Sequence, residues 1–206
     1  MTSQRLSPFD IMCHLVAFPT ISKESNLPLI DWVETYLRSH HITPHRCYND
    51  EKDKAAIFAH VGPEAAGGVV LSGHSDVVPV AGQLWEHDPW TVLQKDNRYY
   101  GRGTCDMKGF VALAIWALVE ARYTDLQKPL QLALSYDEEV GCRGAPSMIE
   151  AMRESLPFAE RVIVGEPSMM QTVTGHKGGI GFETHVSGFE VHSSLIDQGV
   201  SAIMSG

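Results

Sequence analysis

The chain has 206 residues, of which 44% are hydrophobic and 20% charged, and this composition excludes wholesale disorder, a collagen-like repeat and a coiled-coil rod. Its formal net charge is −9, so it lacks the basic face that a nucleic-acid binder needs. The longest strongly apolar run, residues 110–119, is about half as long as a membrane-spanning helix. The N-terminus has no apolar signal segment, and the four cysteines form no CxxC pair. We therefore expect a soluble cytoplasmic protein with reduced thiols and no membrane partner.

Helical and strand patterns alternate through the first 165 residues. Apolar residues recur at helical spacing after Pro28, and short apolar runs bounded by turn residues indicate strands. In chain order we expect a helix at 29–37, strands at 57–61 and 69–72, a buried helix at 106–118, a strand at 130–136, a short helix at 146–152 and a strand at 161–165. Such alternation predicts an α/β fold in which helices cover the faces of a sheet.

The pattern changes after Pro167. Apolar and polar residues alternate over 180–186, which predicts an antiparallel strand with one buried face, and the last residues resemble the start of a helix. We place a boundary near residue 174, so that residues 1–174 form one domain and 175–206 begin another. The second part, about thirty residues, is too short for its own core, so we expect the chain to stop within that domain.

Acidic residues and a histidine follow three of the predicted strands. They are His74 and Asp76 after the strand at 69–72, Asp137, Glu138 and Glu139 after the strand at 130–136, and Glu166 after the last strand, with Asp106 at the start of the buried helix. Because ligands bind outside the carboxyl ends of the strands in open α/β sheets, these groups are expected at one edge. Crowded carboxylates must take up protons or share a cation, and the histidine favours a transition metal such as zinc.

Each of these segments alone is weak evidence for a metal site. An isolated His-Ser-Asp is usually a turn, the three acids after a strand suit a solvated loop, and the glycine-rich segment 101–109 lacks the residue order of a phosphate-binding loop. Their succession at strand ends is what indicates the site. From the residues alone it stays open which of Asp137, Glu138 and Glu139 binds a metal and which acts as a base.

The segments LSGHSDVVP, GRGTCDMKG, SYDEEVG and VGEPS resemble, in this order, the metal-site motifs of the M20 metallopeptidase family. Within this family, the acetylornithine deacetylase branch is the most similar in three segments: GRGTCDMKG, VGEPSMMQTVTGHKGG and the His-Ser-Ser at 192–194. The resemblance covers the chain from about residue 8 to its end. It implies a zinc-peptidase-like catalytic domain on a mixed sheet, together with the beginning of an inserted α+β lid or dimerisation domain.

The resemblance also implies how a pair of zinc (or cobalt) ions would be held. His74 and Glu166 would bind the first ion, Glu139 the second, and Asp106 would bridge the two. With a bridging hydroxide, these three carboxylates balance the charge of two divalent cations. Family members supply a further histidine to the second metal from beyond the lid, and we expect none in this chain because it ends at Gly206.

The same resemblance implies the chemistry. Glu138 would be the general base, Asp76 would hold His74 in one tautomer, and His192 would donate a hydrogen bond to the oxyanion, often across a dimer interface. The implied reaction removes the acetyl group from N2-acetylornithine, a small N-acyl amino acid, in arginine biosynthesis, and the intact enzyme would be a homodimer. The alternatives are a succinyl-diaminopimelate desuccinylase, an aminoacylase, a dipeptidase or an inactive truncated metal-binding fragment. We expect the 206-residue chain alone to be inactive.

Other candidate ligands have ordinary interpretations. Cys105, beside the bridging aspartate, is expected to serve packing. Histidines outside the motifs are expected at the surface or in loops: His14, His40, His41, His45, His60 and His87.

Overall fold

The computed structural model describes residues 4–175 and 177–205, and the chain divides into two compact units, Met1–Met170 and Gln171–Gly206. This division lies four residues before the expected boundary at residue 174. The assignment of the two parts to domains of a longer enzyme stays a prediction.

The first unit is built on a five-stranded sheet. Its strands are β1 (Pro44–Tyr48), β2 (Ala55–Val61), β3 (Val69–His74), β6 (Leu130–Ser135) and β7 (Arg161–Val164). The strand order is β1-β2-β6-β3-β7, in which β3 runs parallel to β6 and β7, and β2 runs antiparallel to β1 and β6. The expected mixed α/β sheet is confirmed, and β1 is an addition to the expected strands.

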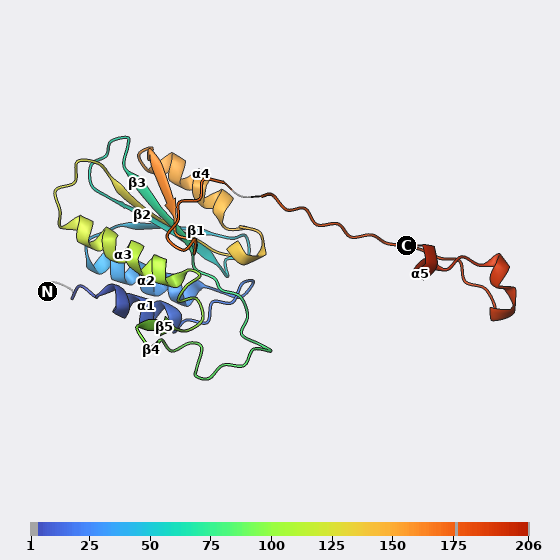
Figure 1. Cartoon of the computed structure of the whole chain (residues 1–206). Helices are drawn as coiled ribbons and strands as arrows, with labels where there is room; N and C mark the ends of the chain where they lie inside the picture. The colour runs from blue at the N-terminus through green and yellow to red at the C-terminus, as the bar shows by residue number, and fades with distance from the viewer. Residues whose placement is uncertain (1–3, 176, 206) are drawn as a thin grey trace. The chain divides into compact units, whose positions relative to one another are not determined.

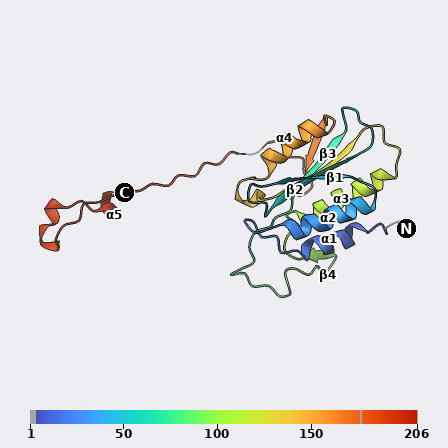
Figure 2. The same cartoon turned by 180° about the vertical axis from the view of Figure 1, so that it is seen from behind.

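Helices cover both faces of this sheet (Figures 1 and 2). One face carries α1 (Pro8–Val16), α2 (Leu27–Ser39) and α3 (Lys108–Arg122), and the other carries α4 (Ala145–Ser155). The larger apolar core lies under the three helices and includes Ile57 of β2, whereas the next residue, Phe58, packs in a smaller core with Met148 of α4. Successive strand residues point to opposite faces, so β2 contributes to both cores.

Helix α1 was not among the expected elements, although the sequence holds its start signal. The Oγ atom of Ser7 accepts the backbone N–H of Asp10 at 3.2 Å, and the Asp10 carboxylate accepts the backbone N–H of Ser7 at 3.2 Å. This capping box, with Pro8 in the first turn, satisfies backbone donors that the helix cannot pair internally.

A small hairpin also escapes prediction from the sequence. It consists of β4 (Leu93–Lys95) and β5 (Arg98–Tyr100), joined by Asp96 and Asn97 with φ values of 51° and 57°. Positive φ at both turn residues is typical of a two-residue hairpin turn, and Asp and Asn tolerate it well. All residues of both strands are exposed, so no buried apolar face marks them in the sequence.

The expectation of a strand at 180–186 is wrong. No strand forms there, and the side chains of Ile180 and Phe182 are 79% and 84% exposed. A strand needs a paired neighbour for its backbone hydrogen bonds, and the described part of the second unit offers only an isolated bridge between Phe189 and Val200. The unit also contains the 3-10 helix η2 (Ser193–Gln198) and α5 (Ala202–Ser205).

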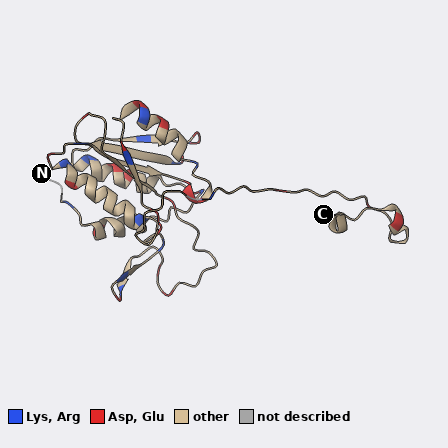
Figure 3. Cartoon of the chain, turned by 45° about the horizontal axis from the view of Figure 1, so that its top comes forward, with Lys and Arg blue, Asp and Glu red and all other residues tan. Residues whose placement is uncertain are grey.

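Charged residues are spread along the chain. Figure 3 shows Lys and Arg interspersed with Asp and Glu on the helices and loops of the first unit. Within the described residues, no helix combines the length and apolarity that crossing a bilayer requires. The acidic groups that bear on function gather at one edge of the sheet.

Candidate metal centre

Three parallel strands bring the candidate ligands to one edge of the sheet. His74 is the last residue of β3, Glu138 begins the 3-10 turn η1 (Glu138–Val140) just after β6, and Glu166 lies two residues after β7. Asp106 lies two residues before α3. Because β3, β6 and β7 are parallel neighbours, their carboxyl ends meet where open α/β sheets bind ligands.

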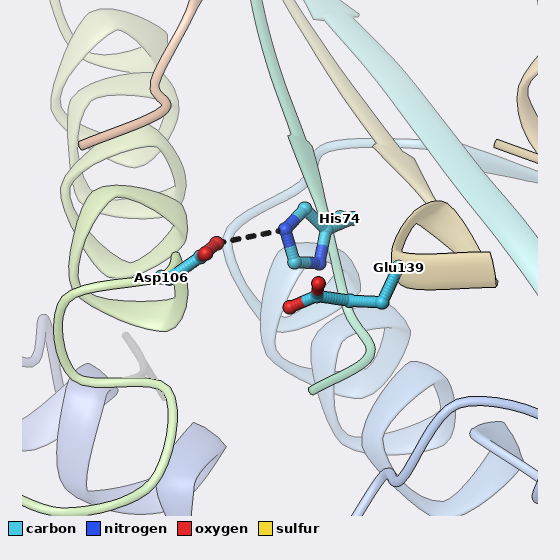
Figure 4. A group of neighbouring side chains, drawn as sticks. All are labelled: His74, Asp106 and Glu139. Atoms are coloured by element: carbon cyan, nitrogen blue, oxygen red, sulfur yellow. Dashed lines mark hydrogen bonds and ion pairs between the residues drawn. The ribbon is translucent and has the colours of Figure 1, made fainter. Parts of the chain in front are cut away.

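The imidazole of His74 lies at the centre of the group. Its side chain is 1% exposed, and Nε2 lies 3.1 Å from Oδ1 of Asp106 and 3.9 Å from Oε1 of Glu166. Figure 4 shows the carboxyl groups of Asp106 and Glu139 on different sides of the ring, both directed toward it. Two sets of three residues bring one ligand atom each to within 4.8 Å of one another: His74 with Asp106 and Glu139, and His74 with Glu138 and Glu166.

Asp76 fixes the tautomer of His74 through its main chain. The Nδ1 atom of His74 lies 2.9 Å from the backbone carbonyl oxygen of Asp76, whereas the Asp76 carboxylate is 3.4 Å away. A carbonyl oxygen can only accept, so Nδ1 donates and the neutral ring keeps its lone pair on Nε2, which faces Asp106. A metal-binding histidine is normally held in this manner.

The Asp76 carboxylate has a second task. It accepts the hydroxyl of Ser22 at 2.6 Å and the backbone N–H groups of Glu138 at 3.1 Å and Glu139 at 3.4 Å. One buried side chain thus ties the histidine's surroundings to the turn with the two glutamates. Sequence reasoning missed Ser22, because the tertiary fold alone brings it to the site.

Without a cation, the charges at this edge of the sheet are poorly balanced. Burial lowers the pKa of His74, but three nearby carboxylates, that of Asp76 foremost, raise it to about 9. Burial and then the charge of Asp106 raise the pKa of Glu139. The pKa of Glu166 is also raised, chiefly by burial, although His74 opposes this shift. Acids pushed toward protonation around an imidazole favour a bound divalent cation, and this mixture of nitrogen and oxygen donors suits zinc.

Sequence reasoning also missed the buried cation beside the site. The Nζ atom of Lys54 lies 2.9 and 2.7 Å from the two carboxylate oxygens of Asp137, and both side chains are less than one tenth exposed. The signal available in the sequence was a lysine three residues before the apolar run expected as a strand at 57–61.

His192 lies in the second unit, at the N-terminal cap of η2. Its Nδ1 accepts the backbone N–H of Ser194 at 3.2 Å. The neutral ring therefore carries its proton on Nε2, where it is available for donation to another group. The side chain is exposed.

Two expectations about other residues are wrong. Cys105 is exposed, so it does not serve packing. His40 is fully buried at the end of α2, because its ring packs against the rings of Tyr36 and Tyr123.

Comparison with known proteins agrees with this geometry. A sequence model of the peptidase family M20/M25/M40 matches residues 70–204. The chain is 35% identical over 199 residues to an acetylornithine deacetylase of Pasteurella multocida (strain Pm70), an alignment that covers 92% of this chain and 50% of that protein. The chain therefore spans about half the length of this curated relative.

Solved structures share the fold. Human carnosine dipeptidase 1 matches 76% of this chain, and 37% of its own, with a TM-score of 0.63 and 20% identity. The M20 family metallo-carboxypeptidase Sso-CP2 from Sulfolobus solfataricus matches 78% of this chain, and 37% of its own, with the same TM-score and identity. At this level of identity the likeness concerns the fold.

Proposed function

Because the chain belongs to the peptidase family M20/M25/M40, whose sequence model matches residues 70–204, we propose that it is part of a metal-dependent hydrolase. The chain provides the metal-binding part of an amidohydrolase that converts N2-acetylornithine to ornithine and acetate. The similarity to an acetylornithine deacetylase supports this substrate over those of other family members. The role in arginine biosynthesis and the homodimer, which the resemblance implies, belong to the same proposal, as does the cytoplasmic location expected from the composition and the N-terminal sequence.

The observation that supports hydrolysis best is the convergence of four carboxylates on one buried imidazole. Asp106, Glu138, Glu139 and Glu166 each place an oxygen in a ligand group with His74. When bound there, zinc would act as a Lewis acid toward the scissile carbonyl and make a water molecule more acidic. The proposed zinc ligands are His74, Asp106 and Glu166 for one ion, and Asp106 with Glu139 for another.

Glu138 is the proposed general base. Its backbone N–H is held by the Asp76 carboxylate, which fixes the turn. The Glu138 carboxylate itself accepts the thiol of Cys142 at 3.5 Å, and a thiol is a weak donor that the substrate water can displace. In the reaction it takes a proton from the attacking water and passes it to the departing amine. Its membership of the group with His74 and Glu166 keeps a ligand role open on geometry alone.

His192 is proposed to donate a hydrogen bond to the oxyanion of the tetrahedral intermediate. Acceptance of the Ser194 N–H at Nδ1 supports this role, because it leaves the Nε2 proton for donation. The second unit would then belong to the lid or dimerisation domain of the intact enzyme.

Turnover by the protein expressed from its whole reading frame tests the substrate. We expect kcat/KM to be highest for N2-acetylornithine when it is compared with succinyl-diaminopimelate and a dipeptide. The Glu138→Gln variant serves as the control for background hydrolysis. If acetylornithine were the slowest of the three substrates, the assignment to this branch would be wrong.

The second candidate function is a non-catalytic, metal-binding chain. Its support is that both ligand groups in the described residues share the single imidazole of His74. Three protein ligands with an open position make a workable zinc site, whereas two carboxylates alone hold zinc weakly. We therefore expect the 206-residue chain to retain about one zinc after dialysis and to show little turnover. Hydrolysis at ~1–10³ s⁻¹, the usual range of enzymes, would contradict this expectation.

A further inference from the structure

Lys54 and Asp137 form a buried ion pair that the proposed chemistry does not use. Lys54 lies directly before β2 and Asp137 two residues after β6. These strands are antiparallel, with Ile57 opposite Leu134. The same register, continued by three residues, places Lys54 opposite Asp137. The pairing of β2 with β6, two neighbouring strands of the sheet, therefore brings Lys54 and Asp137 together.

Asp137 is the residue from which the turn with both glutamates starts. Its backbone is in the left-handed region, with φ of 54°, and the turn η1 follows directly. Besides the lysine, its carboxylate accepts the backbone N–H of Lys23 at 2.8 Å, and its carbonyl accepts the backbone N–H of Arg143 at 3.2 Å. Asp137 thus joins the turn at its start to three other parts of the chain.

Two buried carboxylates hold this turn from two sides. Asp76 accepts the N–H groups of Glu138 and Glu139. Asp137, the residue before them, is anchored by its own carboxylate to Lys54 and to the N–H of Lys23. A buried carboxylate needs a compensating charge, and Lys54 supplies it to Asp137. The other buried lysine, Lys108, donates instead to the carbonyl oxygens of Leu15 and Phe18.

We infer that Lys54 is a positioning residue: paired with Asp137, it fixes the turn so that Glu138 and Glu139 present their carboxylates to His74. The inference rests on the proposed function for its meaning in catalysis. The claim that Lys54 positions the turn rests only on the ion pair with Asp137 and on the hydrogen bonds of the turn. Outer contacts of this kind typically change metal affinity ~10–100-fold when they are removed.

The first test measures amide hydrogen exchange in the metal-free 206-residue chain. Lys54→Met removes the charge at similar length, and we expect faster exchange at the amides of residues 138–142 with unchanged protection in the helices. Lys54→Met/Asp137→Asn guards against simple unfolding, because it removes both charges and leaves none buried without a partner. Faster exchange in the same turn is expected there too.

The matched control is Arg46→Met. Arg46 is a mostly buried cation of β1 that pairs with Asp31 and Glu34 of α2. Its loss should lower the thermal midpoint without changing exchange in residues 138–142. Unchanged turn exchange in both Lys54 variants would overturn the inference.

Zinc titration calorimetry is the second test. We expect the double variant to bind zinc ~10–100-fold more weakly than the unmodified chain, whereas Arg46→Met binds it equally well. Equal affinity in the double variant and the unmodified chain would overturn the inference and leave the proposed function intact. If the unmodified chain bound no zinc, the proposed metal site would fail, and the exchange measurement would still decide the role of Lys54.

Discussion

At the scale of single residues, Asp76 shows how one side chain can serve two neighbours. Its backbone carbonyl accepts from His74, and its carboxylate accepts from the amides of Glu138 and Glu139. The resemblance implied only the contact with the histidine. Because the main chain makes that contact, a substitution at Asp76 should disturb the turn more than the tautomer.

Replacing Glu138 or Glu139 by glutamine, a neutral amide of the same size, should distinguish the roles of the two residues. Glu139→Gln is expected to weaken zinc binding, since the charge of a proposed ligand is lost. Glu138→Gln should keep zinc but reduce turnover of the intact enzyme ~10²–10⁴-fold, because an amide cannot accept the proton. Metal content and kcat measured on both variants check this. If Glu138→Gln lost the zinc and Glu139→Gln kept it, the two roles would have to be exchanged.

A site residue can be predicted from the sequence when it directly follows a predicted strand. His74, Glu138 and Glu166 follow predicted strands, so the rule for strand ends points to them. Lys54 and Ser22 come from distant segments, and only the pairing of β2 with β6 and the path of the loop before α2 bring them in. No local pattern records such contacts. The sequence also does not decide which of Glu138 and Glu139 is the ligand and which the base. The two are neighbours in one turn, and their roles depend on the directions in which their side chains point.

At the scale of elements, the end of β7 packs tightly against α3. A Cβ atom at Gly165 would overlap the ring of Phe110 in α3, so only glycine fits there without a shift. Glu166 follows directly. The packing of a helix on a strand end therefore sets the position of a proposed ligand.

Gly165→Ala is expected to displace Glu166 and weaken zinc binding. Gly165→Ala/Phe110→Ala should recover part of the affinity, because the smaller side chain makes room for the methyl group. Phe110→Ala alone is the control for lost packing. Calorimetric titration of the three variants checks this, and an unaltered affinity in Gly165→Ala would show that the strand end does not govern the ligand.

The end of α2 gives the fold a predictable dependence on pH. His40 is fully buried, with Nδ1 3.1 Å from the Tyr123 hydroxyl, and burial followed by the charge of Arg5 lowers its pKa below 6.5. In the unfolded chain His40 binds a proton more readily than in the fold. Its contribution to stability is therefore complete above the unfolded pKa and declines as the pH falls below it.

His40→Gln should consequently lose less stability on acidification than the unmodified chain. The measurement is the urea midpoint at about pH 7.5 and about pH 5.5, compared between the two proteins. His14→Gln provides the control, because His14 is an exposed histidine on α1. Equal declines in His40→Gln and the unmodified chain would mean that His40 does not contribute to the acid sensitivity.

The elements that escaped prediction have a common cause. Strand β1 and the β4–β5 hairpin present mostly exposed or partly buried residues, so periodic burial is weak in their sequences. At 180–186 the reverse occurs, since alternation is present but no neighbouring strand pairs with it in the described residues. An alternating pattern shows that a segment could bury one face as a strand. Whether the strand forms also depends on a neighbouring strand from another part of the chain.

At the scale of the whole molecule, the sheet has an apolar edge at β7, a strand of four residues. β7 is the last strand of the sheet, and Val162, Ile163 and Val164 are each more than half exposed. An unpaired strand edge with apolar side chains favours pairing with another chain. The 206-residue protein should therefore associate as its concentration rises.

Val162→Lys is expected to reduce this association, because a charged side chain on an edge strand opposes pairing. Leu84→Lys provides the control, since Leu84 is fully exposed in a loop outside any strand. Sedimentation velocity over a range of concentrations measures the effect. An equal reduction by both substitutions would mean that general charge, rather than the edge of β7, controls association.

The central claim is that the carboxyl ends of β3, β6 and β7 together with the start of α3 form a zinc site around His74. Anomalous diffraction at the zinc edge, from crystals of the chain grown with zinc, tests it most directly. The account predicts a peak within bonding distance, about 2.0–2.2 Å, of Nε2 of His74 and of carboxylate oxygens from Asp106 and Glu166. Zinc bound only at other residues, with this edge of the sheet empty in the same crystals, would contradict it.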